Sequence, residues 1–306
     1  MAEGDAAAAA VRPGLSGDAK GALWLLFSSL LFTAMTLLVK VLDGYTPAVQ
    51  AVYTQSAGFI LFLPVIARMR GKVLVLRRWQ TQVGRSLSSV LGVTLSYYAL
   101  HHLPLGEANA LSFTRALWVG PLAALILHER VSRTSWLALG LGFVGVLIVL
   151  QPSTHMVVGR AHLAALASAF FLALTVTGIK VLARHNSLTT IMIWSSIFGI
   201  LFVLPAAIPT WRWPTPRDAL LLLGLGAISV TMTTSYVHGM SLGNAARIIA
   251  VDYVRLPLAI ATGFLVFGTV PTVWMIAGSA LIIATTIWAT TGSRPRDVDP
   301  REEPIP

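Results

Sequence analysis

The sequence predicts an all-α integral membrane protein with ten transmembrane helices, and composition, hydropathy and internal repetition all support this fold class. Charged residues make up 11% of the 306 residues and hydrophobic residues 56%, whereas soluble domains carry about 25% charged residues. Apolar runs of about twenty residues follow one another from Gly21 to Ala289. Each run is long enough to cross a hydrocarbon core of about 30 Å.

The expected spans are separated by short polar or charged connections. They cover Gly21 to Leu42, Pro47 to Ala67, Gly84 to His101, Pro104 to Leu127, Ser135 to Gln151, Ala161 to Ala183, Leu188 to Ile208, Asp218 to Gly239, Leu242 to Phe267 and Thr272 to Ala289. Residues 1–19 are alanine-rich and polar, lack the apolar core of a secretory signal, and are expected to form a disordered cytoplasmic tail. Residues 292–306 are expected to form a second cytoplasmic tail.

The lysines and arginines predict the orientation in the membrane. With a cytoplasmic N-terminus, fourteen of the 22 fall in inside segments and four in outside loops. The other four, Arg85, Arg115, Arg247 and Arg255, fall within or near the spans. Because cytoplasmic loops carry the excess of positive charge, both termini are predicted to be cytoplasmic.

Two halves of the chain resemble each other. KVLDGYTP beginning at Lys40 matches KVLARHNS beginning at Lys180, and Gly106 matches Gly243. The predicted repeat units are residues 20–152 and 160–291, each with five spans. Because five is an odd number, the second unit must enter the membrane from the opposite side, which makes a 5+5 inverted repeat. Substrate sites in such proteins lie near the midplane between the halves.

Charged residues inside the spans are the candidates for function, because each costs roughly 2.5 to 3.5 kcal/mol at the membrane centre. Arg115 lies about eleven residues into the fourth span, and Arg255 lies at a similar depth in the ninth. Two guanidinium groups at one depth would bind a carboxylate or a phosphate. The alternative is structural: Arg115 pairs with Asp252 or Glu107, and Asp252 with Arg255 or Arg247.

Asp252 is the candidate for proton coupling. Burial raises the pKa of a carboxyl group and a neighbouring arginine lowers it, so its protonation would depend on whether cargo occupies that arginine. Aromatic residues would complete the binding site. We expect Trp118, Tyr98, Tyr236 and Tyr253 to contact the substrate, although packing between helices is the alternative for each of them.

The stretch LPLGEANALSFTRALWVGPLAALILHERVSRTSWLALGLGFVGVLIVLQP, residues 103–152, resembles the end of a repeat unit of the drug/metabolite transporter superfamily, EamA-like branch. The resemblance extends over residues 20–291. It implies ten helices, a central cavity lined mainly by helices 1, 3, 4, 6, 8 and 9, and alternating access. Gly268 departs from the pattern, since it stands where the second repeat would carry a glutamate.

These observations favour a secondary transporter of a small organic anion or zwitterion in the bacterial inner membrane. The alternatives are an exporter of amino acids or of lipophilic drugs and cations, and more remotely an intramembrane enzyme. Against an enzyme, the chain has no cysteine and no HExxH or GxSxG motif. The expected partners are a small-molecule substrate and membrane lipid, with no nucleic acid, cofactor or metal. Glycines such as Gly142 and Gly278 would serve a homodimer as well as packing within one chain.

Overall fold

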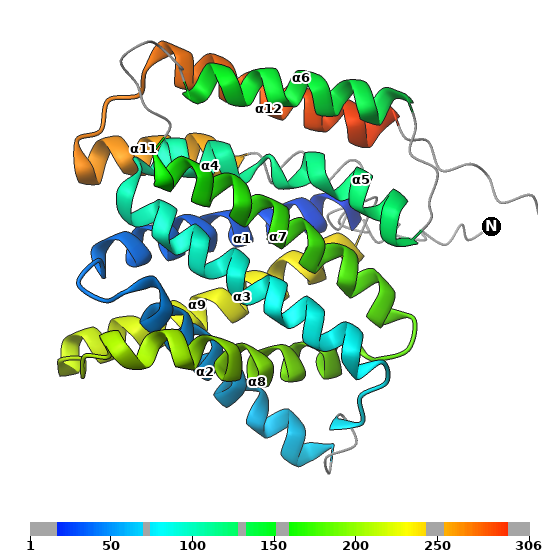
Figure 1. The fold of residues 1–306 in the computed structure, drawn as a ribbon, viewed down its shortest axis with the longest axis vertical. Coiled ribbons are helices and arrows are strands. Elements are labelled where there is room, and N and C mark those ends of the chain that lie inside the picture. Colours follow the sequence, from blue (N-terminus) through cyan, green and yellow to red (C-terminus); the bar gives the residue numbers. More distant parts are fainter. Residues whose placement is uncertain (1–16, 70–73, 128–132, 151–158, 243–253, 293–306) are drawn as a thin grey trace, which may run out of the picture.

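The structure, a computed structural model, describes residues 17–69, 74–127, 133–150, 159–242 and 254–292 (Figure 1). Within these residues every regular element is a helix and no strand occurs. The helices of the first half of the chain are α1 (Gly17–Val41), α2 (Pro47–Arg68), α3 (Trp79–His102), α4 (Leu105–Ser112), α5 (Arg115–Leu127) and α6 (Arg133–Leu150). Those of the second half are α7 (Arg160–Ala183), α8 (Leu188–Ala207), α9 (Pro216–Ser241), α11 (Arg255–Phe267) and α12 (Val273–Gly292), with a 3-10 turn, η2 (Ile208–Thr210), after α8.

Five helical stretches are long and apolar enough to cross a membrane. They are Ala19–Val41, Pro47–Arg68, Arg160–Ala183, Leu188–Thr210 and Pro216–Gly239. Shorter apolar stretches lie in α6, α11 and α12. The all-helical membrane fold predicted from the sequence is therefore confirmed at this level, and the full count of ten spans stays a prediction.

Proline and hydroxyl residues define several helix starts. Pro47 and Pro216 each occupy the first turn of their helix, where the missing N–H leaves no hydrogen bond unmade. The hydroxyl of Thr215 accepts the N–H of Asp218 at 3.2 Å, and that of Ser187 accepts the N–H of Thr190 at 3.1 Å. These caps satisfy backbone donors at the starts of α9 and α8.

The fourth predicted span is not one continuous helix, and the prediction was wrong in this respect. Helix α4 ends at Ser112 and helix α5 begins at Arg115. The hydroxyl of Ser112 donates to the carbonyl of Asn109, and that of Thr114 donates to the carbonyl of Leu111, both at 2.7 Å. Such local bonds compete with the helical ladder. Arg115 is consequently the first residue of a half-helix rather than a residue in the middle of a long one.

The helices of the two halves pack against each other. Helix α3 lies along α7, α1 along α9 and α2 along α8, so the bundle is built from contacts between halves. Helices α6 and α12 lie side by side at one edge of the molecule (Figure 1). In two of these pairs, α2 with α8 and α6 with α12, the two helices are equivalent spans of the two predicted repeat units.

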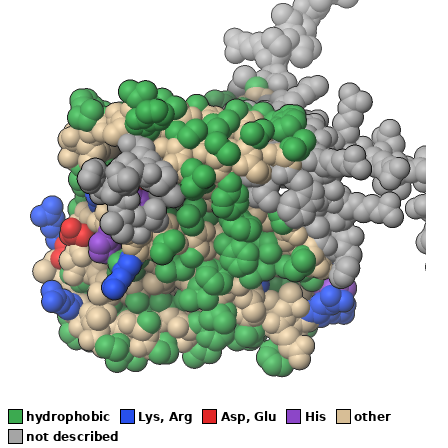
Figure 2. All heavy atoms as spheres, turned by 45° about the horizontal axis from the view of Figure 1, so that its top comes forward, with side chains coloured by type: hydrophobic (Ala, Val, Ile, Leu, Met, Phe, Trp, Pro, Cys, Tyr) green, Lys and Arg blue, Asp and Glu red, His purple; other side chains and the backbone are tan. Residues whose placement is uncertain are grey.

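The surface has the distribution of charge expected of a membrane protein. In Figure 2 hydrophobic side chains cover the middle of the visible face, and Lys, Arg, Asp, Glu and His side chains gather toward its two ends. Large hydrophobic side chains such as Leu125, Leu201 and Leu265 are exposed on the molecule. In water such a surface would be costly, whereas in lipid it is solvated.

Polar bonds join the two halves at both ends of the bundle. At one end, here named the Tyr45 end, the Tyr45 hydroxyl donates to Asp218 at 2.9 Å and Thr46 bonds to Thr210 at 2.9 Å. At the other, the Asn186 end, the backbone N–H of Arg77 donates to the Asn186 side chain at 2.8 Å, and that side chain donates back to the Arg77 carbonyl at 3.0 Å.

Helix α11 ends at Phe267 and is capped by Gly268, whose φ of +66° lies in the left-handed region. Glycine adopts this conformation without the clash that a Cβ would cause. The glutamate expected here from the resemblance would be strained at this position, which gives a local reason for the departure from the family's pattern.

Candidate functional site

Arg255 occupies a buried position between α1, α9 and α11. It is the first residue of α11, and only 7% of its surface is exposed. Its guanidinium carbon lies 4.7 Å from the centre of the Phe32 ring and 5.5 Å from that of the Tyr236 ring. Nη2 donates to the hydroxyl of Ser28 at 3.3 Å. Aromatic faces stabilise a cation without neutralising it, and the effect grows when water is excluded.

The neighbours of Arg255 are themselves held in place. Ser28 is fully buried, and its hydroxyl donates to the backbone carbonyl of Met232 in α9 at 3.0 Å. One turn earlier in α1, the ring of Trp24 meets that of His238 edge to face at 5.0 Å. Side chains of α1, in the first half of the chain, therefore surround Arg255, which belongs to the second half.

Sequence reasoning had singled out Arg255 and Tyr236, which the structure brings together, but not Ser28 or Phe32. The available signal was polar residues inside an apolar helix. The apolar sequence of α1 is interrupted by four hydroxyl residues, all of them buried: Ser28, Ser29, Thr33 and Thr36.

Arg115 begins α5 and is half-buried. Within the described part of the chain it forms no ion pair or hydrogen bond. Its alternative partner Glu107 is bound elsewhere, because the carboxylate of Glu107 lies 2.8 Å from Nε2 of His162. The structural pair of Arg115 with Glu107 is thus not formed.

The predicted aromatic residues have different surroundings. Trp118 packs edge to face against Phe143 of α6 at 5.5 Å and against Phe170 of α7 at 5.4 Å. Tyr98 lies on the ring of His102, one turn away in α3, at 4.2 Å. For these two residues the contacts observed are those of helix packing, the alternative that the sequence left open.

Three further predicted residues, Arg247, Asp252 and Tyr253, lie outside the described residues. Within the described residues no group of three His, Asp or Glu side chains is placed to hold a metal ion.

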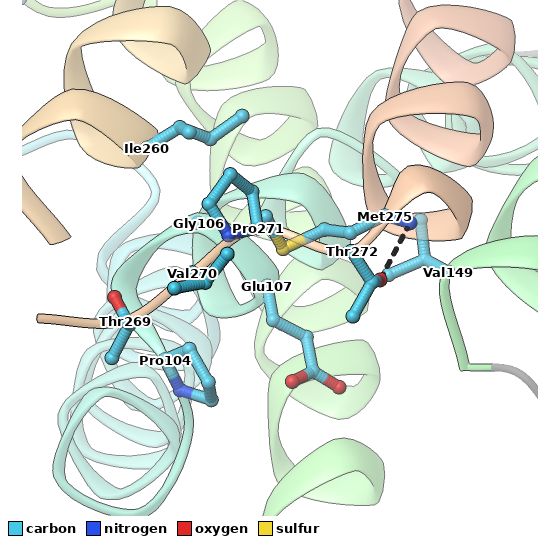
Figure 3. A pocket seen from close by; sticks show the side chains of 10 residues that line it. All are labelled: Pro104, Gly106, Glu107, Val149, Ile260, Thr269, Val270, Pro271, Thr272 and Met275. Atoms are coloured by element: carbon cyan, nitrogen blue, oxygen red, sulfur yellow. Dashed lines mark hydrogen bonds between the residues drawn. The ribbon is translucent and has the colours of Figure 1, made fainter. Parts of the chain in front are cut away.

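A cavity of about 140 Å³ opens at the Tyr45 end, between the start of α4 and the connection of α11 to α12 (Figure 3). Glu107 lines it together with Gly106, Thr269 and Met275. In Figure 3 the Glu107 carboxylate is directed away from Ile260. Neither this cavity nor a second one near Trp211 is lined by Arg115 or Arg255.

The imidazole of His162 has a defined tautomer. The backbone N–H of Gly159 donates to Nδ1 at 3.1 Å, so the proton of the neutral ring is carried by Nε2 and is donated to Glu107. Because Glu107 lies in α4 and His162 in α7, this is a third polar bond between the halves at the Tyr45 end.

Comparison with known proteins gives consistent results. The chain is 27% identical to a riboflavin transporter of Vibrio cholerae over 90% of this chain and 95% of the relative. It is 27% identical to the pseudopaline exporter CntI of Pseudomonas aeruginosa over 87% and 94%, and 24% identical to an S-adenosylmethionine uptake transporter of Rickettsia prowazekii over 75% and 78%. A solved crystal structure shares the fold with a TM-score of 0.63 at 16% identity, covering 89% of this chain and 96% of the other.

The sequence pattern of the EamA-like transporter family is matched twice, over residues 19–151 and again over residues 159–291. The matches leave out little more than the two termini. Together with the apolar helices, they identify an integral protein of the bacterial inner membrane and a transporter rather than an enzyme. The chain belongs to the EamA-like transporter family, within the drug/metabolite transporter superfamily.

Proposed function

We propose that this protein is a secondary transporter that moves a small organic metabolite with a carboxylate or phosphate group across the inner membrane by alternating access. The observation that carries the proposal is the position of Arg255, a cation buried among Ser28, Phe32 and Tyr236 at the junction of both halves. A guanidinium keeps its charge when buried and offers paired donors to an oxyanion.

The helix starts add to this positive potential. Arg115 is the first residue of α5 and Arg255 is the first residue of α11. The N-terminus of a helix carries about half a positive charge and favours anions. Interrupted helices whose half-helix starts point at anionic groups are a recurrent design of secondary transporters. Arg115 and Arg255 would therefore both bind an anionic group of the cargo.

The ten-helix architecture with both termini in the cytoplasm belongs to the same proposal. The twofold match to the family supports repeat units at residues 20–152 and 160–291. The packing of α2 with α8 and of α6 with α12 supports a pseudo-twofold relation between them. In this orientation the Tyr45 end faces outward and the Asn186 end faces the cytoplasm. Trp118, Tyr98 and Tyr253 remain proposed substrate contacts, and a homodimer remains a proposal.

The relatives' names suggest which cargoes to try first. S-adenosylmethionine carries an amino-acid carboxylate, as the proposal requires of the cargo. Riboflavin carries a planar ring system without an ionised carboxylate, and for such a cargo the rings of Phe32 and Tyr236 beside Arg255 would be stacking surfaces. A planar, uncharged metabolite is therefore the second candidate.

The test is the thermal unfolding of purified protein with S-adenosylmethionine, riboflavin, amino acids, dicarboxylates and sugar phosphates. We expect a carboxylate- or phosphate-bearing compound to raise the unfolding temperature, and Arg115→Ala and Arg255→Ala to remove the effect. A stabilising compound that acts equally on both variants would exclude the arginines as its binding groups.

Proton coupling through Asp252 is proposed from the sequence. In proteoliposomes, an imposed pH gradient should accelerate wild-type transport severalfold, because release of cargo would change the affinity of Asp252 for a proton. Asp252→Asn should still exchange cargo across the membrane but should not respond to the gradient. Wild-type transport that is indifferent to the gradient would end the coupling hypothesis.

A further inference from the structure

Arg85 is a second buried arginine, remote in the fold from the start of α11. It lies in α3, and only 7% of its surface is exposed. Its side chain passes Gly178 of α7, where a Cβ would stand 3.0 Å from Cγ of Arg85. Nη1 then donates to the hydroxyl of Ser195 in α8. The guanidinium is thus held at the junction of three helices from both halves.

The charge of Arg85 is not neutralised by an acidic side chain within the described part of the chain. The Nε of Arg85 has no hydrogen-bond acceptor among the residues that the structure describes. Gln82, one turn earlier, is fully buried; its amide nitrogen donates to the Ile191 carbonyl and to Ser195, but its Oε1 has no donor. A buried charge without a partner costs several kcal/mol. The unused Nε–H of Arg85 is therefore a donor that an anion would accept, whereas the unused Oε1 of Gln82 is an acceptor and would not bind an anion.

The position of Arg85, Gln82 and Ser195 along their helices indicates from which side of the membrane an anion would reach them. Arg85 follows the first residue of α3, Trp79, by six positions, which corresponds to about 9 Å of helix. Gly178 and Ser195 lie at similar distances from the ends of α7 and α8 near Asn186. The three residues are consequently close to the headgroup layer at the Asn186 end, where the exposed Arg77 and Arg78 add positive charge.

We propose that Arg85, held by its bond to Ser195, is an anion-binding site at the cytoplasmic end of the bundle, separate from the surroundings of Arg255. The Nε edge of the guanidinium would bind an oxyanion, a phosphate or a carboxylate. That oxyanion is either a dissolved anion, the cargo included, or the headgroup phosphate of an anionic lipid, which basic sites between transmembrane helices also bind. Two parts of this proposal rest on the proposed function: that the site faces the cytoplasm, and that the transported cargo is one of the anions it binds. The binding of phosphate at Arg85 does not depend on it.

The test compares thermal unfolding of the wild type, Arg85→Gln and, as a control at the same end, Arg78→Gln, whose arginine is exposed. Each protein is measured in detergent with inorganic phosphate against chloride at constant ionic strength. Each is also measured in mixed micelles with phosphatidylglycerol against phosphatidylcholine. At saturating anion we expect the unfolding temperature of the wild type and of Arg78→Gln to rise by about 2–4 °C, and Arg85→Gln to show no rise.

A response to phosphate assigns the site to dissolved anions, and a response to phosphatidylglycerol alone assigns it to lipid. Without added anion, Arg85→Gln should unfold at the same or a higher temperature than the wild type, because an unneutralised buried charge has been removed. A lower unfolding temperature with an unchanged anion response would mean that Arg85 serves only packing and would overturn the proposal. Arg255→Gln, measured in parallel, should keep the phosphate response, so failure of the central site and failure of this one are distinguishable.

Discussion

Replacing Gly278 with valine is expected to lower the unfolding temperature more than any other single change discussed here. Gly278 of α12 faces α6, and a Cβ at this position would stand 2.6 Å from the carbonyl oxygen of Gly145 and 2.8 Å from the backbone nitrogen of Val149. Backbone atoms cannot rotate away as a side chain can, so the two helices would have to separate. Overpacking costs about 1–3 kcal/mol or more.

The matched control is Gly140→Val in α6, where a Cβ would meet nothing within 4 Å. Both substitutions add the same atoms to an apolar helix, and valine is intrinsically no worse than glycine inside a helix. Scanning fluorimetry of the purified variants should therefore show a drop of several degrees for Gly278→Val and little change for Gly140→Val. Equal drops would mean that the close approach of α6 and α12 does not stabilise the fold.

Replacing Arg255 with glutamine is expected to weaken cargo binding by about 10- to 100-fold, because hydrogen bonds to a charged group contribute about 1.5–3 kcal/mol. Arg255→Lys keeps the charge but loses the paired donors, and should lie between glutamine and the wild type. The apparent KM for transport in proteoliposomes is the measurement.

The control for Arg255 is Arg212→Gln, which removes an exposed arginine near the Tyr45 end. It reports the loss of one positive charge at a distance from the proposed site. Were Arg212→Gln to raise KM as much as Arg255→Gln does, the effect would come from the overall charge of the protein and not from a binding contact.

The positions of the helices could be predicted from the sequence because hydropathy alone determines where a chain can cross lipid. The break between α4 and α5 could not, since it depends on hydroxyl bonds of Ser112 and Thr114 that compete with an otherwise apolar helix. The prediction placed Arg115 in the middle of a continuous helix, whereas it is the first residue of α5.

The candidate site could be predicted in part. The sequence singled out both Arg255 and Tyr236 as binding residues, and their side chains do meet. Repetition could not reveal Ser28 and Phe32, because which face of α1 turns toward α9 is decided by packing. It also gave no reason to single out Arg85, which has no charged counterpart in the second half: Leu222, Leu223 and Gly224 occupy the corresponding stretch of α9.

The central claim is that the positive charge at position 255 binds a negatively charged cargo. The chain has no cysteine, so Arg255→Cys provides a single thiol that can be modified with reagents of chosen charge. The measurement is the cargo-induced shift in unfolding temperature after modification with an aminoethyl, a methyl or a sulfonatoethyl methanethiosulfonate, with complete labelling verified by mass spectrometry. The account predicts that the aminoethyl adduct restores a large part of the shift and that the neutral and negative adducts restore none; equal shifts for all three adducts would contradict it.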